Sequence, residues 1–411
     1  MRIKQLKFEK ISIWDVWVLL TAFVLVIPDG IGHISPWAQV LLYRWGLYAV
    51  YIGILLMFFM RAMHLKTLSK TFISFTVFIA ATICILFLRG HGFSSWFSTF
   101  SACLFVVLFA EANREYLDKL ILSFLIVLEF WIYVNFALMI LIPEGLYYSE
   151  THNYYLNWVL GYKSSLQYYI LPALCFSWIN MKYRNQRMRY LALLAVSWET
   201  TIVTQNGMLL IGLIVFTAFQ FSKLWNKEKL FNIWTYFIVD IAVNVLFIFF
   251  LTWFSKTGIG MQLFLFLGKT ATVSRRASII WPMTMDYIKE HLFFGNGMYT
   301  AETRIFLYNG IKGFIHSHNQ LLEILFIGGI FLMVFYVFLH IQIGKSLTAN
   351  SNTAVGKIIS MSIFILYLMM VVEVFTRSVA APIWFILFLG GNCKFAHNAF
   401  LQRKDCLYSE H

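Results

Sequence analysis

Long apolar runs, separated by mostly short polar connections, fill the chain. A helix that crosses a bilayer needs about 20 mostly apolar residues, and about twelve runs approach this length. The predicted spans are 11–27, 41–60, 71–88, 93–110, 120–142, 166–181, 188–203, 205–222, 231–254, 320–341, 357–374 and 379–392. The pattern therefore predicts an all-α, polytopic integral membrane protein with about twelve transmembrane helices, forming a single domain over residues 1–411.

The long connection at residues 255–318 is the main interruption of this pattern. Loops that carry polar side chains on a rigid scaffold are common places for binding and chemistry. Within this connection, residues 264–269 are expected to form a re-entrant or surface helix. Residues 277–291 have an apolar side that includes Ile279, Ile280, Met283 and Tyr287, which predicts an amphipathic helix lying on the membrane.

Composition and charge agree with a membrane protein. The chain is 60% hydrophobic and 12% charged, whereas soluble domains carry about 25% charged residues. The net charge of +13 would suggest nucleic acid in a soluble protein. Lysine and arginine, however, concentrate in alternate connections, which marks those connections as cytoplasmic. We therefore predict cytoplasmic termini, an outer catalytic loop at residues 255–318, a location in the plasma membrane and no nucleic-acid partner.

Two basic and two histidine positions stand near the ends of the outer loop. Arg275 and Arg276 precede the amphipathic helix, where a guanidinium group suits phosphate oxygens; the alternative is that both arginines only reach lipid head groups. Ser317 and Gln320 match a capping box, which predicts that His318 lies in the first turn of the helix at 320–341. A helix N-terminus favours a bound anion and a neutral imidazole that can accept a proton. The alternative is that His318 is only a polar residue at the interface.

Metal and relay chemistry have weaker support. His316 and His318 could both reach a metal, but no third ligand is close in the sequence, and Asp286, Glu290 and Glu302 are unconvincing. We therefore predict no metal and no cofactor. Acids inside predicted spans are costly and suggest function. Glu129 and Asp240 are such acids, and they fit a transporter's proton relay or, as we favour, an interhelical clamp.

The order of motifs in the outer loop resembles the bacterial O-antigen ligase and polysaccharide polymerase (Wzy-type) family. The motifs are Ser274–Trp281 (SRRASIIW), Phe294–Gly297 (FGNG), His318–Leu322 (HNQLL) and the pair Gly328–Gly329. The resemblance covers mainly residues 255–330, with a weaker similarity at Leu160–Lys163 and Leu171–Pro172. One departure concerns the start of the eighth span, where many relatives carry Ser-Arg and this chain has Gln205–Asn206.

The resemblance implies a metal-independent, inverting glycosyl transfer from a glycan on undecaprenyl diphosphate. Arg276, or Arg275, would clamp the diphosphate, and His318 would take the proton from the acceptor hydroxyl or orient it. Asn319 and His316 are the neighbouring candidates for substrate binding. Glu323 would orient His318 or the acceptor, or be only a first-turn helix residue. The phosphate contact that the departure removes would come from an outward-facing basic residue: Lys163, Arg89, Arg377 or Arg44.

Three functions remain open at this stage. The first is a polysaccharide repeat-unit polymerase for capsule, exopolysaccharide or O-antigen synthesis. The second is a related O-antigen-type ligase that uses a different acceptor, and the third is a flippase or exporter of lipid-linked oligosaccharide. Transporters tend to show repeated halves, and none is visible here, so we favour an enzyme. We predict the polymerase, although the sequence does not separate it cleanly from the ligase. Its expected partners are the lipid-linked oligosaccharide, membrane lipid, and a flippase and chain-length regulator of the same pathway.

Overall fold

The computed structural model describes residues 12–63, 67–90, 92–149, 154–222, 232–266, 275–310 and 315–409. The first half of the chain holds α1 (Ile13–Leu25), α2 (Ile31–Ile34), α3 (Pro36–Gln39), η1 (Val40–Gly46), α4 (Leu47–Ala62), α5 (Lys70–Arg89), α6 (Phe93–Ala112), η2 (Arg114–Tyr116), α7 (Leu117–Leu141), the antiparallel strands β1 (Tyr147–Ser149) and β2 (Tyr154–Asn157), η3 (Lys163–Ser165), α8 (Gln167–Arg184), α9 (Arg187–Val203) and α10 (Gly207–Phe221).

The second half holds α11 (Ile233–Phe254), α12 (Gly258–Phe266), η7 (Arg276–Ile280), α13 (Trp281–Glu290), α14 (Ala301–Leu307), α15 (Gln320–Ala349), α16 (Ala354–Met370), η8 (Ser378–Ala380), α17 (Ala381–Gly391) and α18 (Cys393–Ser409). The all-α prediction is therefore confirmed, with one short hairpin as the exception among the described residues.

The predicted number of twelve spans is not confirmed. Every predicted run falls on a helix, but the described residues contain six helices long and apolar enough to cross a membrane. These are Pro36–Ala62, Lys70–Arg89, Phe93–Ala112, Arg114–Leu141, Tyr236–Phe254 and Gln320–Ala349. A seventh would be the pair Ser378–Gly391 and Cys393–Gln402, which is bent by 87°. The other runs form helices that are shorter or more polar. An apolar run is also expected for a helix that is buried inside the bundle, so it does not by itself indicate a span.

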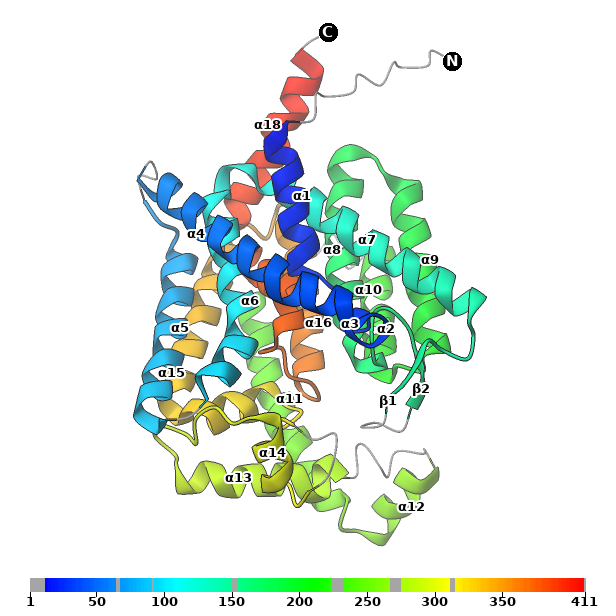
Figure 1. Cartoon of the computed structure of the whole chain (residues 1–411), viewed down its shortest axis with the longest axis vertical. Coiled ribbons are helices and arrows are strands. Elements are labelled where there is room, and N and C mark those ends of the chain that lie inside the picture. The colour runs from blue at the N-terminus through cyan, green and yellow to red at the C-terminus, as the bar shows by residue number, and fades with distance from the viewer. Residues whose placement is uncertain are drawn as a thin grey trace.

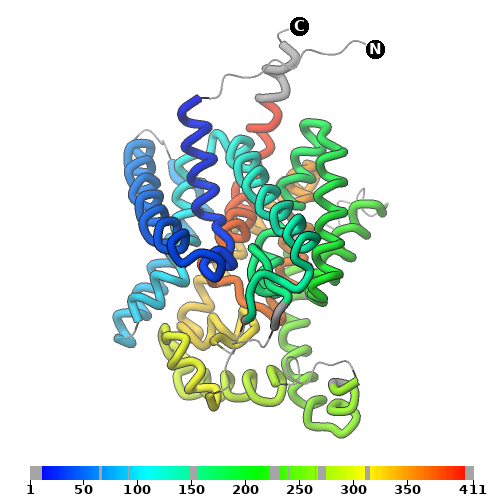
Figure 2. The backbone as a smooth tube through the Cα atoms, turned by 45° about the vertical axis from the view of Figure 1, so that its right-hand side comes forward, coloured from blue at the N-terminus to red at the C-terminus, as the bar shows by residue number. Residues whose placement is uncertain are grey.

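The two ends of the bundle differ in what they carry. The start of α1 and helix α18 lie at one end, and α12, α13 and α14 lie at the other (Figure 1; Figure 2). The described part of the segment 255–318 therefore forms a cap on the end opposite to α18 and the start of α1, as the predicted topology requires. Which end faces the cytoplasm stays a prediction.

The predicted amphipathic helix is present as η7 followed by α13. Its inner side is formed by Ala277, Ile280, Trp281, Thr284 and Ile288, which are buried. Of the neighbouring predicted helix at 264–269, residues 264–266 end α12, and residues 267–269 lie outside the described residues.

Helix α15 contains a break that joins this cap to the bundle. Gly329 has φ +59° and ψ −156°, a conformation that favours glycine. The backbone N–H groups of Ile330 and Phe331 donate to the carbonyls of Leu292 and Phe293, at 2.9 and 3.0 Å. A Cβ on Gly329 would lie 2.4 Å from the Leu292 oxygen. The cap is thus held by backbone hydrogen bonds to the part of α15 that directly follows its break.

Candidate active site

The site is built around a non-helical connection, Val371–Arg377, between α16 and η8. The sequence pattern placed most of it inside a predicted span at 357–374, but α16 ends at Met370, so this boundary was wrong. Side chains from three other parts of the chain bond to the backbone of the connection. Three side chains donate to its carbonyls: Asn319 Nδ2 to Val371 O at 2.9 Å, Arg276 Nη1 to Val372 O at 2.9 Å, and Tyr168 Oη to Val374 O at 2.8 Å. In the opposite direction, the Phe375 backbone N–H donates to Gln320 Oε1 at 2.7 Å.

The turn that carries the two histidines is fixed by a buried ion pair. Arg304 Nη2 donates to Glu323 Oε1 at 2.6 Å, and Ser317 N donates to Glu323 Oε2 at 2.9 Å. The Arg304 guanidinium also lies 3.5 Å from the ring centre of Phe326. Glu323 therefore ties α14 to the turn before α15 and does not contact His318 through these bonds. Both charges are buried and need each other, because an unpaired buried charge is costly.

The predicted capping box at Ser317 and Gln320 is wrong. Helix α15 begins at Gln320, and its N-cap is Asn319, whose Oδ1 accepts from Leu322 N at 3.0 Å. Asn319 Nδ2 donates to Asn244 Oδ1 at 2.6 Å as well as to the Val371 carbonyl. This amide therefore connects the start of α15 to α11 and to the connection that carries Glu373. His318 consequently precedes the helix, with a left-handed φ of +52°. Asparagine and histidine accept such positions better than most residues.

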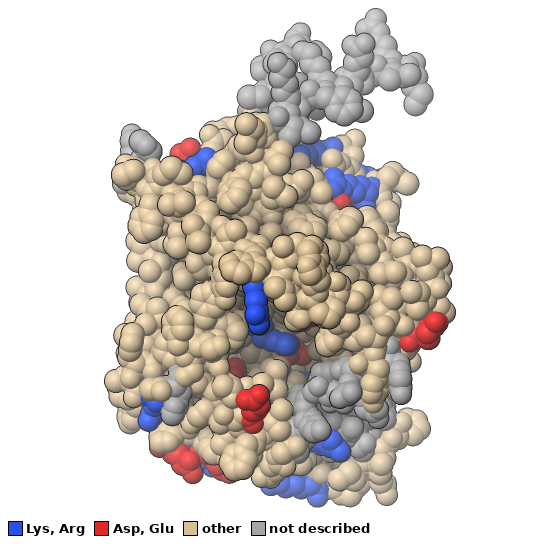
Figure 3. All heavy atoms as spheres, viewed as in Figure 1, with Lys and Arg blue, Asp and Glu red and all other residues tan. Residues whose placement is uncertain are grey.

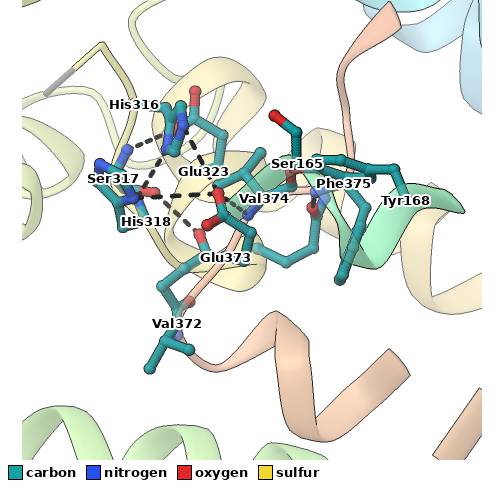
Figure 4. A network of polar contacts seen from close by, with 12 residues as sticks. Ser165, Tyr168, His316, Ser317, His318, Glu323, Val372, Glu373, Val374 and Phe375 are labelled. Carbon is teal, nitrogen blue, oxygen red and sulfur yellow. Dashed lines mark hydrogen bonds and ion pairs between the residues drawn. The ribbon is translucent and has the colours of Figure 1, made fainter. Parts of the chain in front are cut away.

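His316, His318 and Glu373 form a compact buried cluster (Figure 4). One possible ligand atom from each residue lies within 4.8 Å of the others. His316 Nε2 is 3.7 Å and His318 Nδ1 is 4.0 Å from Glu373 Oε1. The sequence offered no third partner for the histidines, and the structure supplies Glu373. Two imidazoles and a carboxylate are a donor set that transition metals accept. Whether these three residues could hold a metal depends on which ring nitrogens carry hydrogen.

The hydrogen bonding of His316 argues against a metal in this arrangement. The His318 backbone N–H donates to His316 Nδ1 at 3.1 Å. A ring nitrogen that accepts a hydrogen bond carries no proton, so the neutral His316 ring carries its hydrogen on Nε2. This is the nitrogen that faces Glu373, and a metal ligand needs an unprotonated nitrogen. The cluster is therefore better suited to holding protons than to holding a cation.

The charge balance around Glu373 is set by two arginines. Burial raises the pKa of the Glu373 carboxyl above its ordinary value, while the nearby positive charges of Arg276 and Arg377 act in the opposite direction. The Arg276 guanidinium interacts electrostatically with Glu373 and with Tyr162. The connection thus brings one acid, two imidazoles and two guanidinium groups together, which is suitable for moving a proton beside an anionic group.

A cavity of about 230 Å³ opens beside the cluster. His316, Glu323, Arg304 and Arg377 form its charged and titratable wall. In the space-filling view, a hollow on this face of the molecule contains both basic and acidic side chains (Figure 3). The remaining lining residues are Ser95, Ser98, Thr99, Met298, Tyr299, Ala301, Ile315, Ile327, Val374, Thr376 and Ser378.

Most of the site residues predicted from sequence converge here. His316, His318, Asn319, Glu323, Arg276 and Arg377 all lie at the cluster, its connection or its cavity. Arg275 is exposed, so the structure separates it from Arg276. Lys163 starts η3, directly after Tyr162, and its carbonyl accepts from Asn206 Nδ2. Arg89 ends α5, is half-buried and does not line the cavity.

Sequence reasoning missed Glu373 and Arg304. Glu373 stands at the end of an apolar run, where it looked like part of a span. The signal that could have exposed it is its charge, since an ionisable residue inside a predicted span is costly and suggests function. Arg304 lies within a segment that has no distinctive pattern.

The acids in predicted spans have structural partners. Glu129 on α7 accepts from Arg189 Nε on α9 at 2.8 Å. Asn244 Nδ2 donates to Asp240 Oδ1 at 2.7 Å, and both residues lie on α11. Glu129 therefore forms the interhelical clamp that we favoured. Asp240 instead continues the hydrogen-bonded series that starts at Asn319 and passes through Asn244.

Comparison with known families supports the resemblance read from the sequence. Residues 200–337 match the family model described as O-Antigen ligase. The matched region includes α10 to the first part of α15, and therefore Arg276, both site histidines and Arg304, but not the connection with Glu373. No curated protein matches the chain. The apolar helices indicate a multi-pass membrane protein, and the matched region is similar to the O-antigen ligase family.

Proposed function

We propose that this protein is a polysaccharide repeat-unit polymerase. It transfers a glycan from undecaprenyl diphosphate onto a sugar hydroxyl of another lipid-linked repeat unit, outside the cytoplasm. The observation that carries the proposal is the meeting of His318, Glu373 and Arg276 at one connection, in a chain that matches the O-antigen ligase family. Transfer from a diphosphate needs a base for the acceptor and positive charge for the leaving group, and these residues supply both.

In the proposed reaction, His318 accepts the proton of the acceptor hydroxyl. The oxygen of that hydroxyl forms a bond to the anomeric carbon of the donor as the bond from that carbon to the diphosphate oxygen breaks. The leaving diphosphate takes the electron pair, and attack from the opposite face inverts the anomeric configuration. Glu373 stabilises the imidazolium of His318, and Arg276 balances the charge on the diphosphate. No metal is needed, because guanidinium already provides the positive charge.

Arg276 suits this role better than Arg275. Its Nη1 donates to the carbonyl of Val372, the residue before Glu373, and this bond holds the guanidinium group near Glu373. Its Nε is buried and has no hydrogen-bond partner among the described residues, so one donor of the fork is unused. A phosphate oxygen would satisfy that donor.

Reconstitution in liposomes tests the proposal. Purified protein is supplied only with lipid-linked single repeats, and the products are separated by length. Wild-type protein should build chains, His318→Ala and Arg276→Ala should leave single repeats, and Arg275→Ala serves as the matched exposed control. Chains of unchanged length from the double variant His318→Ala/Arg276→Ala would refute the proposed site.

The same assay separates the alternative functions. A ligase would lengthen nothing until a different acceptor is added. A flippase would move single repeats across the bilayer without joining them, and its loss in cells would leave repeats on the inner leaflet. Loss of a polymerase would leave them on the outer leaflet.

A further inference from the structure

The cavity beside the histidine cluster carries chemistry that the proposed mechanism does not use. Besides its charged wall, it is lined by serine and threonine residues from two separate parts of the chain. Ser95, Ser98 and Thr99 come from the first turns of α6, and Thr376 and Ser378 come from the connection and η8. The two sides are in direct contact, because Cys103 Sγ on α6 lies 4.0 Å from the Arg377 carbonyl.

One of these hydroxyls is without a partner inside the protein. Thr376 is only 3% exposed, and its Oγ1 has no hydrogen-bond partner among the described residues. A buried polar atom of this kind usually bonds to water or to a ligand. Because Thr376 lines the cavity, a ligand there can supply the missing bond.

The size and polarity of the cavity restrict the ligand. Pockets for drug-sized ligands measure about 300–1,000 Å³, so a cavity of about 230 Å³ fits a single ring. The hydroxyl lining is unfavourable for a lipid tail. The Glu323 carboxylate in the wall would repel a phosphate group. Of the two arginines in the wall, Arg304 is neutralised by Glu323, and Arg377 interacts with the Glu373 carboxylate.

We propose that this cavity is a subsite for one sugar ring of the lipid-linked glycan. A pyranose presents several hydroxyls that both donate and accept, and these match the threonine and serine hydroxyls and the Glu323 carboxylate. Tyr299 supplies an aromatic surface in the same lining. The inference rests on the proposed function, since it places a sugar of the donor or acceptor against His316, next to the reacting groups.

Kinetics of reconstituted protein test the subsite and identify the source of the sugar. Thr376→Val removes the hydroxyl and keeps the shape, and Ser98→Ala/Thr99→Val removes two hydroxyls from the opposite side. Thr76→Val on α5 is the matched control, because its hydroxyl bonds only to the Phe72 carbonyl of its own helix among the described contacts. Loss of one neutral hydrogen bond should raise KM about 3- to 10-fold, with kcat nearly unchanged.

For this experiment the donor and the acceptor are two different lipid-linked glycans, and each is varied while the other is held constant. The substrate whose KM rises is the one that occupies the cavity. A rise for the lipid-linked acceptor, or for the lipid-linked donor, supports the subsite in either case. An unchanged KM for both substrates in both variants overturns it.

A binding experiment without turnover keeps the subsite separate from the proposed function. Methyl glycosides of glucose, galactose, mannose and N-acetylglucosamine are tested by saturation-transfer NMR on the protein in lipid nanodiscs. At least one should bind to wild-type and Thr76→Val protein and lose most of its signal with Thr376→Val. If none binds, or if Thr376→Val binds equally well, the subsite is refuted even when polymerisation is observed. Binding without any polymerisation would instead refute the proposed function alone.

Discussion

The ion pair between Arg304 and Glu323 gives a quantitative prediction about how the histidine turn is held. Their side chains are 4% and 7% exposed, and the distance between Nη2 and Oε1 is 2.6 Å. Removing one partner of such a buried pair costs about 3–5 kcal/mol, because the other charge is left uncompensated. Glu323→Gln keeps an acceptor for the Ser317 N–H but loses the charge, and Arg304→Met keeps the approximate volume. Each single variant should therefore lose about 3 kcal/mol of unfolding free energy.

The double variant separates the interaction energy of the pair from the contribution of each side chain's other contacts. Arg304→Met/Glu323→Gln leaves no unpaired charge, so it should be less destabilised than the sum of the single variants, by about 2–3 kcal/mol. Equilibrium unfolding in mixed micelles, followed by the fluorescence of the 14 tryptophans, measures all four proteins. The reasoning is refuted if the single effects add up, or if Arg304→Met is as stable as the wild type.

The same pair should affect transfer through the turn that it positions. Glu323 also accepts the hydrogen bond of the Ser317 backbone, directly before His318. Glu323→Gln should thus lower kcat in protein that is still folded. Arg304→Met should lower kcat by a smaller factor, because Glu323 can still accept the hydrogen bond from the Ser317 N–H. Equal rates per folded molecule in all four proteins would show that the turn keeps its position without the pair.

Four further predictions follow from other parts of the molecule. Glu373→Gln should lower kcat about 10- to 100-fold with little change in KM, because the imidazolium loses its carboxylate; a pure KM effect in steady-state kinetics would contradict this role. Glu129→Gln should reduce stability but not the transfer rate of folded protein, and a lost rate would favour the relay interpretation over the clamp to Arg189. Gly329→Ala should destabilise the protein by at least about 2 kcal/mol in the same unfolding assay, from the left-handed backbone and the contact with Leu292; wild-type stability would contradict it. In a cysteine-free background, Phe306→Cys on α14 should react with an impermeant thiol reagent from outside the cell, whereas Asn352→Cys, in the turn after α15, should react only after permeabilisation; the reverse pattern would invert the predicted topology.

The sequence predicted the helical class and the location of the site for physical reasons. Apolar runs reveal helices whatever their partners are, so each predicted run coincides with a helix. Their lengths do not reveal which helices cross the membrane, and this is why the number of spans was not confirmed. Arg276 and His318 could be selected because polar residues in a long connection between apolar runs contrast with their surroundings.

The parts that sequence reasoning missed depend on contacts between distant residues. Glu373 joins His316 and His318 across more than fifty positions of the chain, and no local pattern records this. The N-cap was assigned to Ser317 when Asn319 occupies it, because both residue types cap helices well and the choice depends on backbone angles. Arg304 was overlooked because its partner, Glu323, lies in another helix.

The break at Gly329 has a consequence for how the protein responds to the thickness of its membrane. Only residues 330–349 of α15 form a continuous rod after the break, and at 1.5 Å per residue this rod measures about 30 Å, one hydrocarbon layer. Before the break, the carbonyls of Phe326 and Ile327 accept from the N–H groups of Asn296 and Gly297, and after it the N–H groups of Ile330 and Phe331 donate to Leu292 and Phe293. Residues 292–297 are therefore bonded to both sides of the glycine. When the rod tilts in a thinner or thicker bilayer, these bonds carry the tilt into that segment, so the cap moves together with the rod.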